Sequence, residues 1–216
     1  MTQTVLIVGG TQMVGRDFVE SLLKVSDYNI SIANRGITNP QLFPDLYHIF
    51  IDRNSLEGCA SLKNLEFDVV IDFSCYNVAH LKNVLYYISY KHYVLISTQS
   101  VLDTNALANP NNWLFRYAND KKQIEQYIIQ KSLENFSIVR PCALYGKNDY
   151  TNRFYEKNGQ YYWRYNDQPV IKNKGYINVR DFSYSLLQFL NSKNLPKTKI
   201  VHIDGDGITY VSNSSL

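Results

Sequence analysis

The architecture follows from one short stretch near the start of the chain, Val5-Leu6-Ile7-Val8-Gly9-Gly10-Thr11-Gln12-Met13-Val14-Gly15. Its first four residues are apolar and predict a strand, and residues 13–25 carry apolar side chains at helical spacing. Between strand and helix, Gly9 permits a tight turn and Gly15 lets the helix pack closely on the sheet. The helix N-terminus then offers backbone N–H groups and the positive end of its dipole to a pyrophosphate. We therefore expect a dinucleotide site here, built from Gly9, Gly10, Thr11, Gln12, Met13, Val14 and Gly15.

Gln12 stands where the usual three-glycine spacing has its middle glycine. A side chain at this position would lie near the phosphates. We expect it either to point away from them or to hydrogen-bond to them.

Beyond this stretch, apolar runs alternate with segments of helical period. The expected strands are residues 5–8, 29–33, 46–51, 67–73, 93–97, 136–139 and 199–203. The expected helices are residues 13–25, 79–90, 117–132 and one that runs from an N-cap at Asp181 to about Leu190. This alternation predicts an α/β fold, a Rossmann-like doubly wound parallel sheet. We expect residues 1–216 to form one domain, with 145–176 as a small, shortened C-terminal substrate lobe.

The composition is that of an ordinary globular chain, with 45% hydrophobic residues, 19% charged residues and a net charge of +3. Its Lys and Arg residues are scattered, which argues against a dedicated nucleic-acid binder. No apolar run approaches the ~18 residues that a membrane span requires, and no signal-peptide pattern precedes the first strand. Cys59, Cys75 and Cys142 are widely spaced, and the four histidines lack ligand spacing. We expect free thiols, no metal and a cytoplasmic location.

The residues after the second strand bear on the choice of cofactor. Folds that prefer NAD usually place an acidic residue there, whereas this chain has Asn34-Arg35-Gly36. An arginine attracts the 2′-phosphate of NADP and stacks on adenine, so the sequence favours NADP. The alternative is that Arg35 is solvated and the site takes either NADP or NAD. Asp52, after the third strand, is a candidate acceptor for the adenine amino group.

Tyr117 and Lys121 stand four residues apart on a predicted helix and therefore share one face. An ammonium beside a phenol lowers the pKa of the phenol, which makes the tyrosine a general acid or base for interconverting a carbinol and a carbonyl. Thr98, just after the fifth strand, is placed to hydrogen-bond the same substrate oxygen.

The chain resembles the extended short-chain dehydrogenases/reductases of the NAD-dependent epimerase/dehydratase family, in an atypical branch. The motifs that carry the resemblance follow the family's order over nearly the whole chain. They are GGTQMVG at 9–15, NRG at 34–36, DR at 52–53, DFSCY at 72–76, STQSV at 97–101, YANDKKQIE at 117–125, RPCALYG at 140–146 and NVRD at 178–181.

The resemblance implies a catalytic triad of Thr98, Tyr117 and Lys121, with Lys121 also holding the nicotinamide ribose. It implies further cofactor contacts along the later strands, at Phe73, Ser74, Cys75, Ser97, Pro141 and Leu144. Members of the family commonly pair through two helices, which implies a homodimer. Gln99 and Ser100 stand where nucleotide-sugar 4,6-dehydratases have Asp and Glu, which argues against dehydration.

The stretch 145–176 places arginines among many tyrosines. Arginines beside aromatic rings suit a phosphorylated ligand that carries a base, such as a nucleotide sugar. The expected substrate contacts are Tyr76, Tyr145, Arg153, Trp163 and Arg164. The alternative is a tyrosine-rich lobe that packs on itself or on a second subunit.

Three functions remain open from the sequence. The first is an NAD(P)-dependent epimerase or reductase that acts on a nucleotide sugar or a related hydroxyl compound by hydride transfer, with Tyr117 moving the proton. The second is a cofactor-sensing or binding protein that has lost the chemistry, which the short C-terminal part of the chain supports. The third is RNA binding, because the chloroplast stem-loop RNA-binding proteins share the GGT and NRG motifs; the mild charge counts against it.

Overall fold

The computed structural model describes residues 2–25, 27–104, 113–192 and 199–211. Its main sheet has eight strands, which in chain order are β1 (Gln3–Val8), β2 (Tyr28–Asn34), β3 (Tyr47–Phe50), β4 (Glu66–Asp72), β5 (Ser89–Ile96), β6 (Phe136–Pro141), β11 (Lys199–Asp204) and β12 (Gly207–Tyr210). Their spatial order is β12-β11-β6-β5-β4-β1-β2-β3, and all pairs are parallel except β11 with β12. The order reverses at β1 and β4, so the predicted doubly wound sheet is confirmed.

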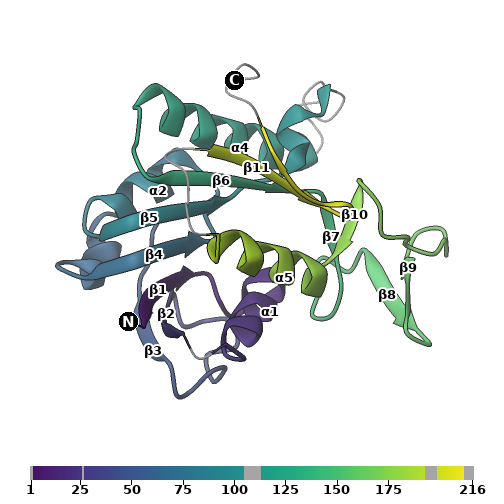
Figure 1. The fold of residues 1–216 in the computed structure, drawn as a ribbon, viewed down its shortest axis with the longest axis horizontal. Coiled ribbons are helices and arrows are strands. Elements are labelled where there is room, and N and C mark those ends of the chain that lie inside the picture. The colour runs from purple at the N-terminus through teal and green to yellow at the C-terminus, as the bar shows by residue number, and fades with distance from the viewer. Residues whose placement is uncertain (1, 26, 105–112, 193–198, 212–216) are drawn as a thin grey trace.

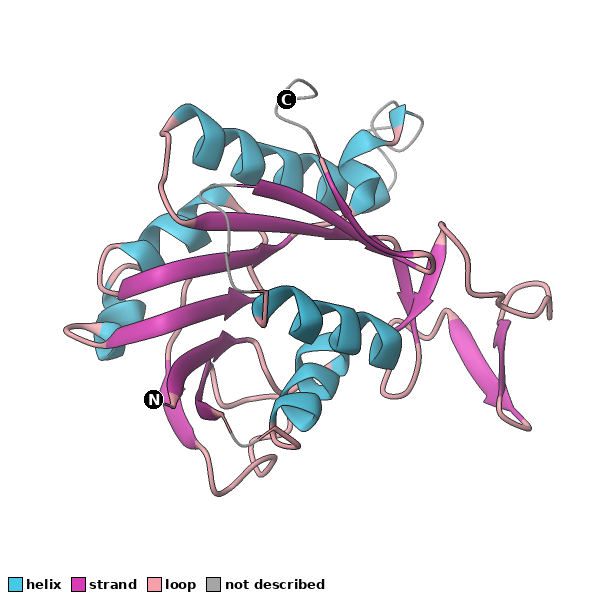
Figure 2. Ribbon diagram, viewed as in Figure 1, coloured by secondary structure: helices cyan, strands magenta, loops and turns pink. Residues whose placement is uncertain are grey.

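Helices cover both faces of this sheet (Figures 1 and 2). The helices α1 (Met13–Leu22) and α5 (Val179–Leu190) contact each other on one face. The helices α2 (Val78–Leu85) and α4 (Trp113–Gln130) contact each other on the opposite face. Two 3-10 turns, η1 (Glu57–Leu62) and η2 (Gln99–Leu102), follow β3 and β5.

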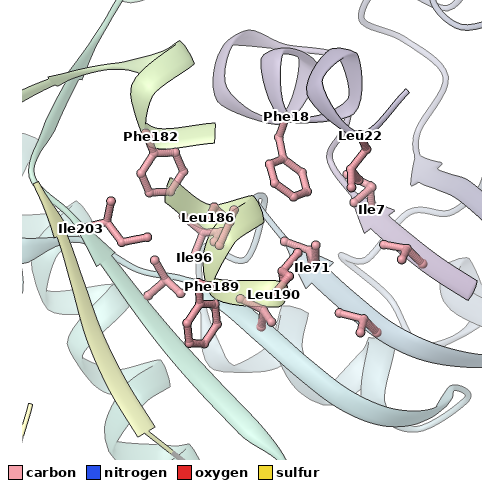
Figure 3. Packing of buried hydrophobic residues seen from close by; sticks show 14 of the residues in the cluster. Ile7, Phe18, Leu22, Ile71, Ile96, Phe182, Leu186, Phe189, Leu190 and Ile203 are labelled. Carbon is pink, nitrogen blue, oxygen red and sulfur yellow. The ribbon is translucent and has the colours of Figure 1, made fainter. Parts of the chain in front are cut away.

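The hydrophobic core forms one layer on each face of the sheet because side chains alternate along every strand. In β1, Val5 and Ile7 pack toward α1 and α5, whereas Leu6 and Val8 pack toward α2 and α4. Figure 3 shows the first layer, in which Phe18 of α1 and Phe182 of α5 lie over Ile7, Ile71 and Ile96 of the strands. The buried central strands read as continuous apolar runs for this reason.

The boundaries of all four predicted helices differ from those in the structure. The helix expected over 13–25 ends at Leu22, and the one expected over 117–132 spans Trp113–Gln130. The helix expected over 79–90 ends at Leu85, because the following residues begin β5 at Ser89. The N-cap of α5 is Asn178, whose side chain accepts a hydrogen bond from the Arg180 N–H. Asp181 lies in the first turn of α5 and pairs with Lys172 at 2.9 Å.

The stretch 145–176 contributes short strands that lie beyond the main sheet (Figure 1). Here β7 (Ala143–Tyr145) pairs in parallel with β10 (Tyr176–Asn178), and β8 (Phe154–Lys157) forms an antiparallel hairpin with β9 (Gln160–Trp163). The hairpin projects away from the helices and strands of the main body. A small apolar cluster joins the hairpin to its neighbours, centred on Phe154 of β8, Tyr145 of β7 and Val170 after β9.

Candidate functional site

The glycine turn joins β1 to α1 at the carboxyl edge of the sheet, beside the point where the strand order reverses. Gly9 has a φ of +90°, and a Cβ there would lie 2.8 Å from the Cβ of Ser74. A Cβ on Gly15 would lie 2.2 Å from the Gly9 carbonyl oxygen. A Cβ on Gly10 would instead crowd Ile7 and Val19, at 3.0 and 3.1 Å. Gly9 and Gly15 therefore shape the turn, whereas Gly10 lets α1 pack on the sheet.

The start of α1 is suited to an anion. Gln12 is the N-cap with an extended backbone, and its side chain makes no capping hydrogen bond. All residues of α1 lie in the part of the chain that the structure describes, and none in its first turn is acidic. The first backbone N–H groups of a helix have no intrahelical acceptor, so those of Met13, Val14 and Gly15 suit the pyrophosphate of a dinucleotide.

The loop after β2 lies against the glycine turn. Asn34 donates from its amide to the Thr11 hydroxyl at 3.3 Å and accepts from the Gly36 N–H at 2.8 Å. Asn39 donates to the Thr11 carbonyl oxygen at 2.9 Å. These bonds hold the loop in place and leave Arg35 exposed at its tip. The two hydrogen bonds of Asn34 thus fix the conformation of the loop, and the neighbouring Arg35 side chain is exposed to solvent.

Asp52 is exposed after β3 and lies in a short polar chain of hydrogen bonds. One of its oxygens, Oδ1, accepts from the Asn54 side chain at 2.7 Å, and the side-chain oxygen Oδ1 of Asn54 lies 3.0 Å from Nε2 of His80. Burial, followed by the nearby Arg53 cation, lowers the pKa of His80, and the Arg35 cation lowers it further. His80 could not be placed here from the sequence, because its neighbour Asn54 is far from it in the chain.

A buried ion pair that the sequence analysis missed lies under the reversal point. Arg53, next to Asp52, points inward and binds Asp72 at the end of β4 with two hydrogen bonds of 2.8 and 2.7 Å. The carboxylate of Asp72 also accepts from the Tyr93 hydroxyl at 2.6 Å, and Arg53 donates to the Ser74 hydroxyl at 3.1 Å. The Arg53 guanidinium lowers the pKa of Asp72 against the opposing effect of burial. This network holds Ser74 against Gly9.

The two neighbours of Ser74 face different ways. The Phe73 ring packs on Phe18 of α1, with ring centroids 5.6 Å apart. Cys75 is buried in the opposite core layer, and burial raises the pKa of its thiol to about 12. All three cysteines are free and buried, as predicted, so Cys75 is a core thiol without nucleophilic character.

Tyr117 and Lys121 lie one turn apart on α4, as predicted, and Lys121 is fully buried. Its ammonium donates to the Ile96 carbonyl oxygen at 2.6 Å. The same nitrogen lies 5.4 Å from the centre of the Tyr76 ring and 5.9 Å from that of Tyr117. Tyr76, one of the expected substrate contacts, therefore lies beside the expected catalytic pair of Tyr117 and Lys121.

The expected effect of Lys121 on the Tyr117 phenol is wrong. Burial raises the pKa of Tyr117 to about 12, with a further rise from Tyr150, and the cation that opposes this rise is Arg153. Burial also lowers the pKa of Lys121. The phenol is therefore held in its protonated form, because a desolvated phenolate is costly.

Ser97 and Thr98 follow Ile96 at the end of β5. The Thr98 hydroxyl accepts from the Ser100 N–H at 3.2 Å and so caps η2, which packs against α4. The Ser97 hydroxyl donates to the Glu125 carboxylate inside the protein. The Ser97 hydroxyl is thus engaged within the protein, and a contact of Ser97 with the cofactor stays a prediction.

The loop that follows β7 carries two residues, Tyr150 and Arg153, whose charges act on Tyr117 of α4. Pro141 is buried at the end of β6, and Leu144 in β7 accepts from Arg153 through its carbonyl oxygen at 3.3 Å. Tyr150, which the prediction did not include, adds to the effect of burial in raising the pKa of the Tyr76 phenol. Arg153 and Tyr150 are thus the lobe residues that interact with the Tyr76 and Tyr117 phenols.

The other expected substrate residues lie in β7 and at the end of the β8–β9 hairpin. Tyr145 is buried in the small cluster, and Trp163 packs on Phe154 with ring centroids 4.4 Å apart. Arg164 is exposed and lies over the Tyr155 ring at 5.6 Å. For Tyr145 and Trp163, the alternative of a lobe that packs on itself describes the structure better.

Two other features bear on the class of site. Among the described residues, no group of His, Cys, Asp or Glu is arranged to hold a metal ion. No helix in the described ranges is both long and apolar enough to cross a membrane.

Fold and site together define a Rossmann-type α/β protein with a tyrosine–lysine pair at the carboxyl edge of its sheet, and solved structures share this fold. An NADP complex of a short-chain dehydrogenase/reductase from Veillonella parvula is 13% identical over 90% of each chain, with a TM-score of 0.62. The enzyme WbmF from Bordetella bronchiseptica, in complex with NAD+ and UDP, is 15% identical over 97% of this chain and 74% of its own, with a TM-score of 0.67. ADP-L-glycero-D-manno-heptose-6-epimerase from Helicobacter pylori is 14% identical over 97% and 79%, with a TM-score of 0.66.

These similarities show that the chain has the fold of short-chain dehydrogenases/reductases. No protein-family model and no curated protein sequence matches the chain.

Proposed function

We propose that the chain is an NAD(P)-dependent oxidoreductase or epimerase of the extended short-chain dehydrogenase/reductase type, which acts on a nucleotide sugar or a related hydroxyl or carbonyl compound. The observation that carries the proposal is the position of Tyr117 and Lys121. They lie side by side on α4, and Lys121 is bonded to the end of β5 at the edge where α/β sheets bind their ligands. Solved structures of the same fold contain NADP, or NAD+ with UDP.

The dinucleotide fits the residues at this edge. The first turn of α1 supplies N–H groups for the pyrophosphate, Asp52 an acceptor for the adenine amino group, and Lys121 a donor for the nicotinamide ribose. The exposed Arg35 favours NADP, because a guanidinium pairs with a 2′-phosphate and no carboxylate follows β2 to repel it. When bound, a nicotinamide ring supplies the hydride donor or acceptor.

Tyr117 is the proton-transfer group in this proposal. A tyrosine phenol is protonated at neutral pH, so Tyr117 donates its proton to a carbonyl oxygen as hydride reaches the carbonyl carbon. In the reverse direction the carbinol oxygen returns its proton to the phenolate. An epimerase runs both directions on one carbon, and a reductase runs only the first. Thr98 is proposed to hold the same substrate oxygen.

Arg153 and Tyr76 are the proposed substrate contacts closest to this centre. Arg153 already carries one anchoring bond to Thr151 at 2.8 Å and one to the Leu144 carbonyl oxygen, and these hold its guanidinium in place. A fixed guanidinium suits a phosphate or another anionic group of the substrate.

A binding protein that keeps the dinucleotide site without turnover is the second candidate, and the raised pKa of Tyr117 favours it. The two are separated by incubating the protein with NADP(H), then NAD(H), and a panel of UDP-, ADP- and dTDP-linked sugars. Oxidation or reduction is followed at 340 nm and epimerisation by proton NMR. We expect turnover of at least one sugar nucleotide. Tight cofactor binding without turnover across the panel would favour the binding protein.

A further inference from the structure

Three consecutive residues at the end of β5 make three different connections. The Ile96 carbonyl oxygen accepts from Lys121, the Ser97 hydroxyl donates to Glu125, and the Thr98 hydroxyl caps η2. Lys121 and Glu125 both belong to α4. This short segment is therefore bonded to α4 twice in succession, immediately before the proposed catalytic threonine.

Glu125 extends the line of functional residues on α4. Tyr117, Lys121 and Glu125 are spaced four residues apart and so share one face of the helix. Glu125 is only 3% exposed, and Arg140 of β6 donates to both of its carboxylate oxygens, with 3.1 Å from Nε to Oε1. One buried carboxylate thus joins α4 to the ends of two adjacent strands.

We propose that Glu125 is a positioning residue, which acts through Ser97 and Arg140 to hold the end of β5 against α4. Ser97 lies between Ile96 and Thr98 in the chain. Its bond to Glu125 therefore fixes two groups at once, namely the Ile96 carbonyl group that accepts from Lys121 and the Thr98 hydroxyl group. This inference rests on the proposed function, in which Lys121 binds the nicotinamide ribose. The adenosine half of the cofactor is held elsewhere, by the glycine turn, Asp52 and Arg35.

The inference therefore predicts an effect on one half of the cofactor only. The test variant is Ser97→Ala, which removes the bond between β5 and Glu125 but leaves the Glu125–Arg140 ion pair. The probes are NADPH and 2′,5′-ADP, which carries the adenosine half alone, with NADH and ADP in their place if the protein prefers NAD(H). Dissociation constants are measured by calorimetry.

The matched control is Ser137→Ala. Ser137 is a fully buried serine on the neighbouring strand β6, and its hydroxyl is bonded to His92 of β5 at 2.8 Å. This variant also removes one buried hydroxyl bond between elements but leaves Glu125 intact. A second test variant, Glu125→Leu with Arg140→Met, removes both charges together so that no buried charge is left unpaired.

We expect Ser97→Ala to weaken NADPH binding about tenfold, the effect of one well-placed hydrogen bond, and to leave 2′,5′-ADP binding within about twofold. The double variant should behave in the same way, and Ser137→Ala should change neither constant. If Ser97→Ala leaves NADPH binding unchanged, or weakens both ligands equally, Glu125 is not a positioning residue. If the unaltered protein binds neither pyridine nucleotide, the proposed function itself fails and the inference with it.

Discussion

The ammonium of Lys121 lies 2.6 Å from the carbonyl oxygen of Ile96, so the lysine on α4 is bonded to the carboxyl end of β5. Because Lys121 is fully buried, this bond fixes the ammonium in one position beside the rings of Tyr76 and Tyr117. A lysine held in this way has donors left for a second partner. In our account that partner is the ribose of a nicotinamide cofactor.

Replacing Tyr117 with Phe tests the proton-transfer role. The variant keeps the ring that packs beside Lys121 and removes only the phenolic hydroxyl. We expect kcat on any substrate that the unaltered protein turns over to fall by about 10²- to 10⁴-fold, the usual contribution of a general acid, while cofactor affinity is retained. The control is Tyr127→Phe, on the same helix, whose ring lies under the Lys82 ammonium; it should leave kcat unchanged. Undiminished turnover in Tyr117→Phe would remove the tyrosine from the mechanism.

Gly9→Ala tests the shape of the glycine turn. The new methyl group would lie 2.8 Å from the Cβ of Ser74, in a backbone with φ of +90°. Gly159→Ala is the matched control, because its φ is +78° but nothing lies within 4 Å of the added carbon. We expect the control to lower the free energy of unfolding by about 1 kcal/mol through backbone strain alone and to keep cofactor affinity. Gly9→Ala should lose more stability and most of its dinucleotide affinity; equal behaviour of the two variants would count against the turn as the binding element.

His92 makes a specific contribution to the dependence of stability on pH. Burial lowers its pKa from 6.5 to about 4, and its Nε2 is bonded to the Ser137 hydroxyl at 2.8 Å. Between these two values the unfolded chain binds a proton that the folded chain does not. The free energy of unfolding therefore falls as the pH drops from 6.5 to 4, by about 3 kcal/mol for this group. Urea unfolding across this range should show a shallower fall in His92→Gln, and parallel curves would contradict the assignment.

The buried ion pair of Arg53 and Asp72 lies where the strand order reverses, and we expect its loss to lower the free energy of unfolding more than the loss of a surface pair. Arg53→Met leaves a fully buried carboxylate without its cation, and we expect a loss of about 3–5 kcal/mol in the free energy of unfolding. Adding Asp72→Asn to this variant removes the unpaired charge and should restore much of the loss. Arg16→Met is the control, because Arg16 pairs with Glu20 on the surface of α1, and it should cost less than about 1 kcal/mol. The losses are measured by thermal unfolding. A similar loss in Arg53→Met and Arg16→Met would show that the buried pair contributes no more to stability than a surface pair does.

The sheet and its glycine turn could be predicted because their signals are local. Val5–Val8, the turn and the apolar stripe of α1 follow one another in the chain, and each has a period that matches its structure. The same holds for the face shared by Tyr117 and Lys121. The helix expected up to Tyr90 was wrong because that part of the chain gives no stop signal before β5 begins.

Features that depend on long-range contacts could not be predicted. Arg53 follows the exposed Asp52, and only the folded sheet reveals that it points inward to Asp72, nineteen residues later. Ser97 lies in a predicted binding motif, yet its hydroxyl meets Glu125 across two elements. In the tyrosine-rich stretch after Tyr145, the sequence shows no period that would separate core rings from exposed ones.

The most direct test is to measure the dissociation constants of NADPH, NADP+, NADH and NAD+ for the purified chain by calorimetry at one fixed ionic strength. We expect saturable binding with one site per chain, tighter for NADP(H) than for NAD(H), and loss of that preference in Arg35→Ala. A clear preference for NAD(H) would overturn the role of Arg35. Absence of binding for all four nucleotides would contradict the central claim that this glycine turn holds a dinucleotide.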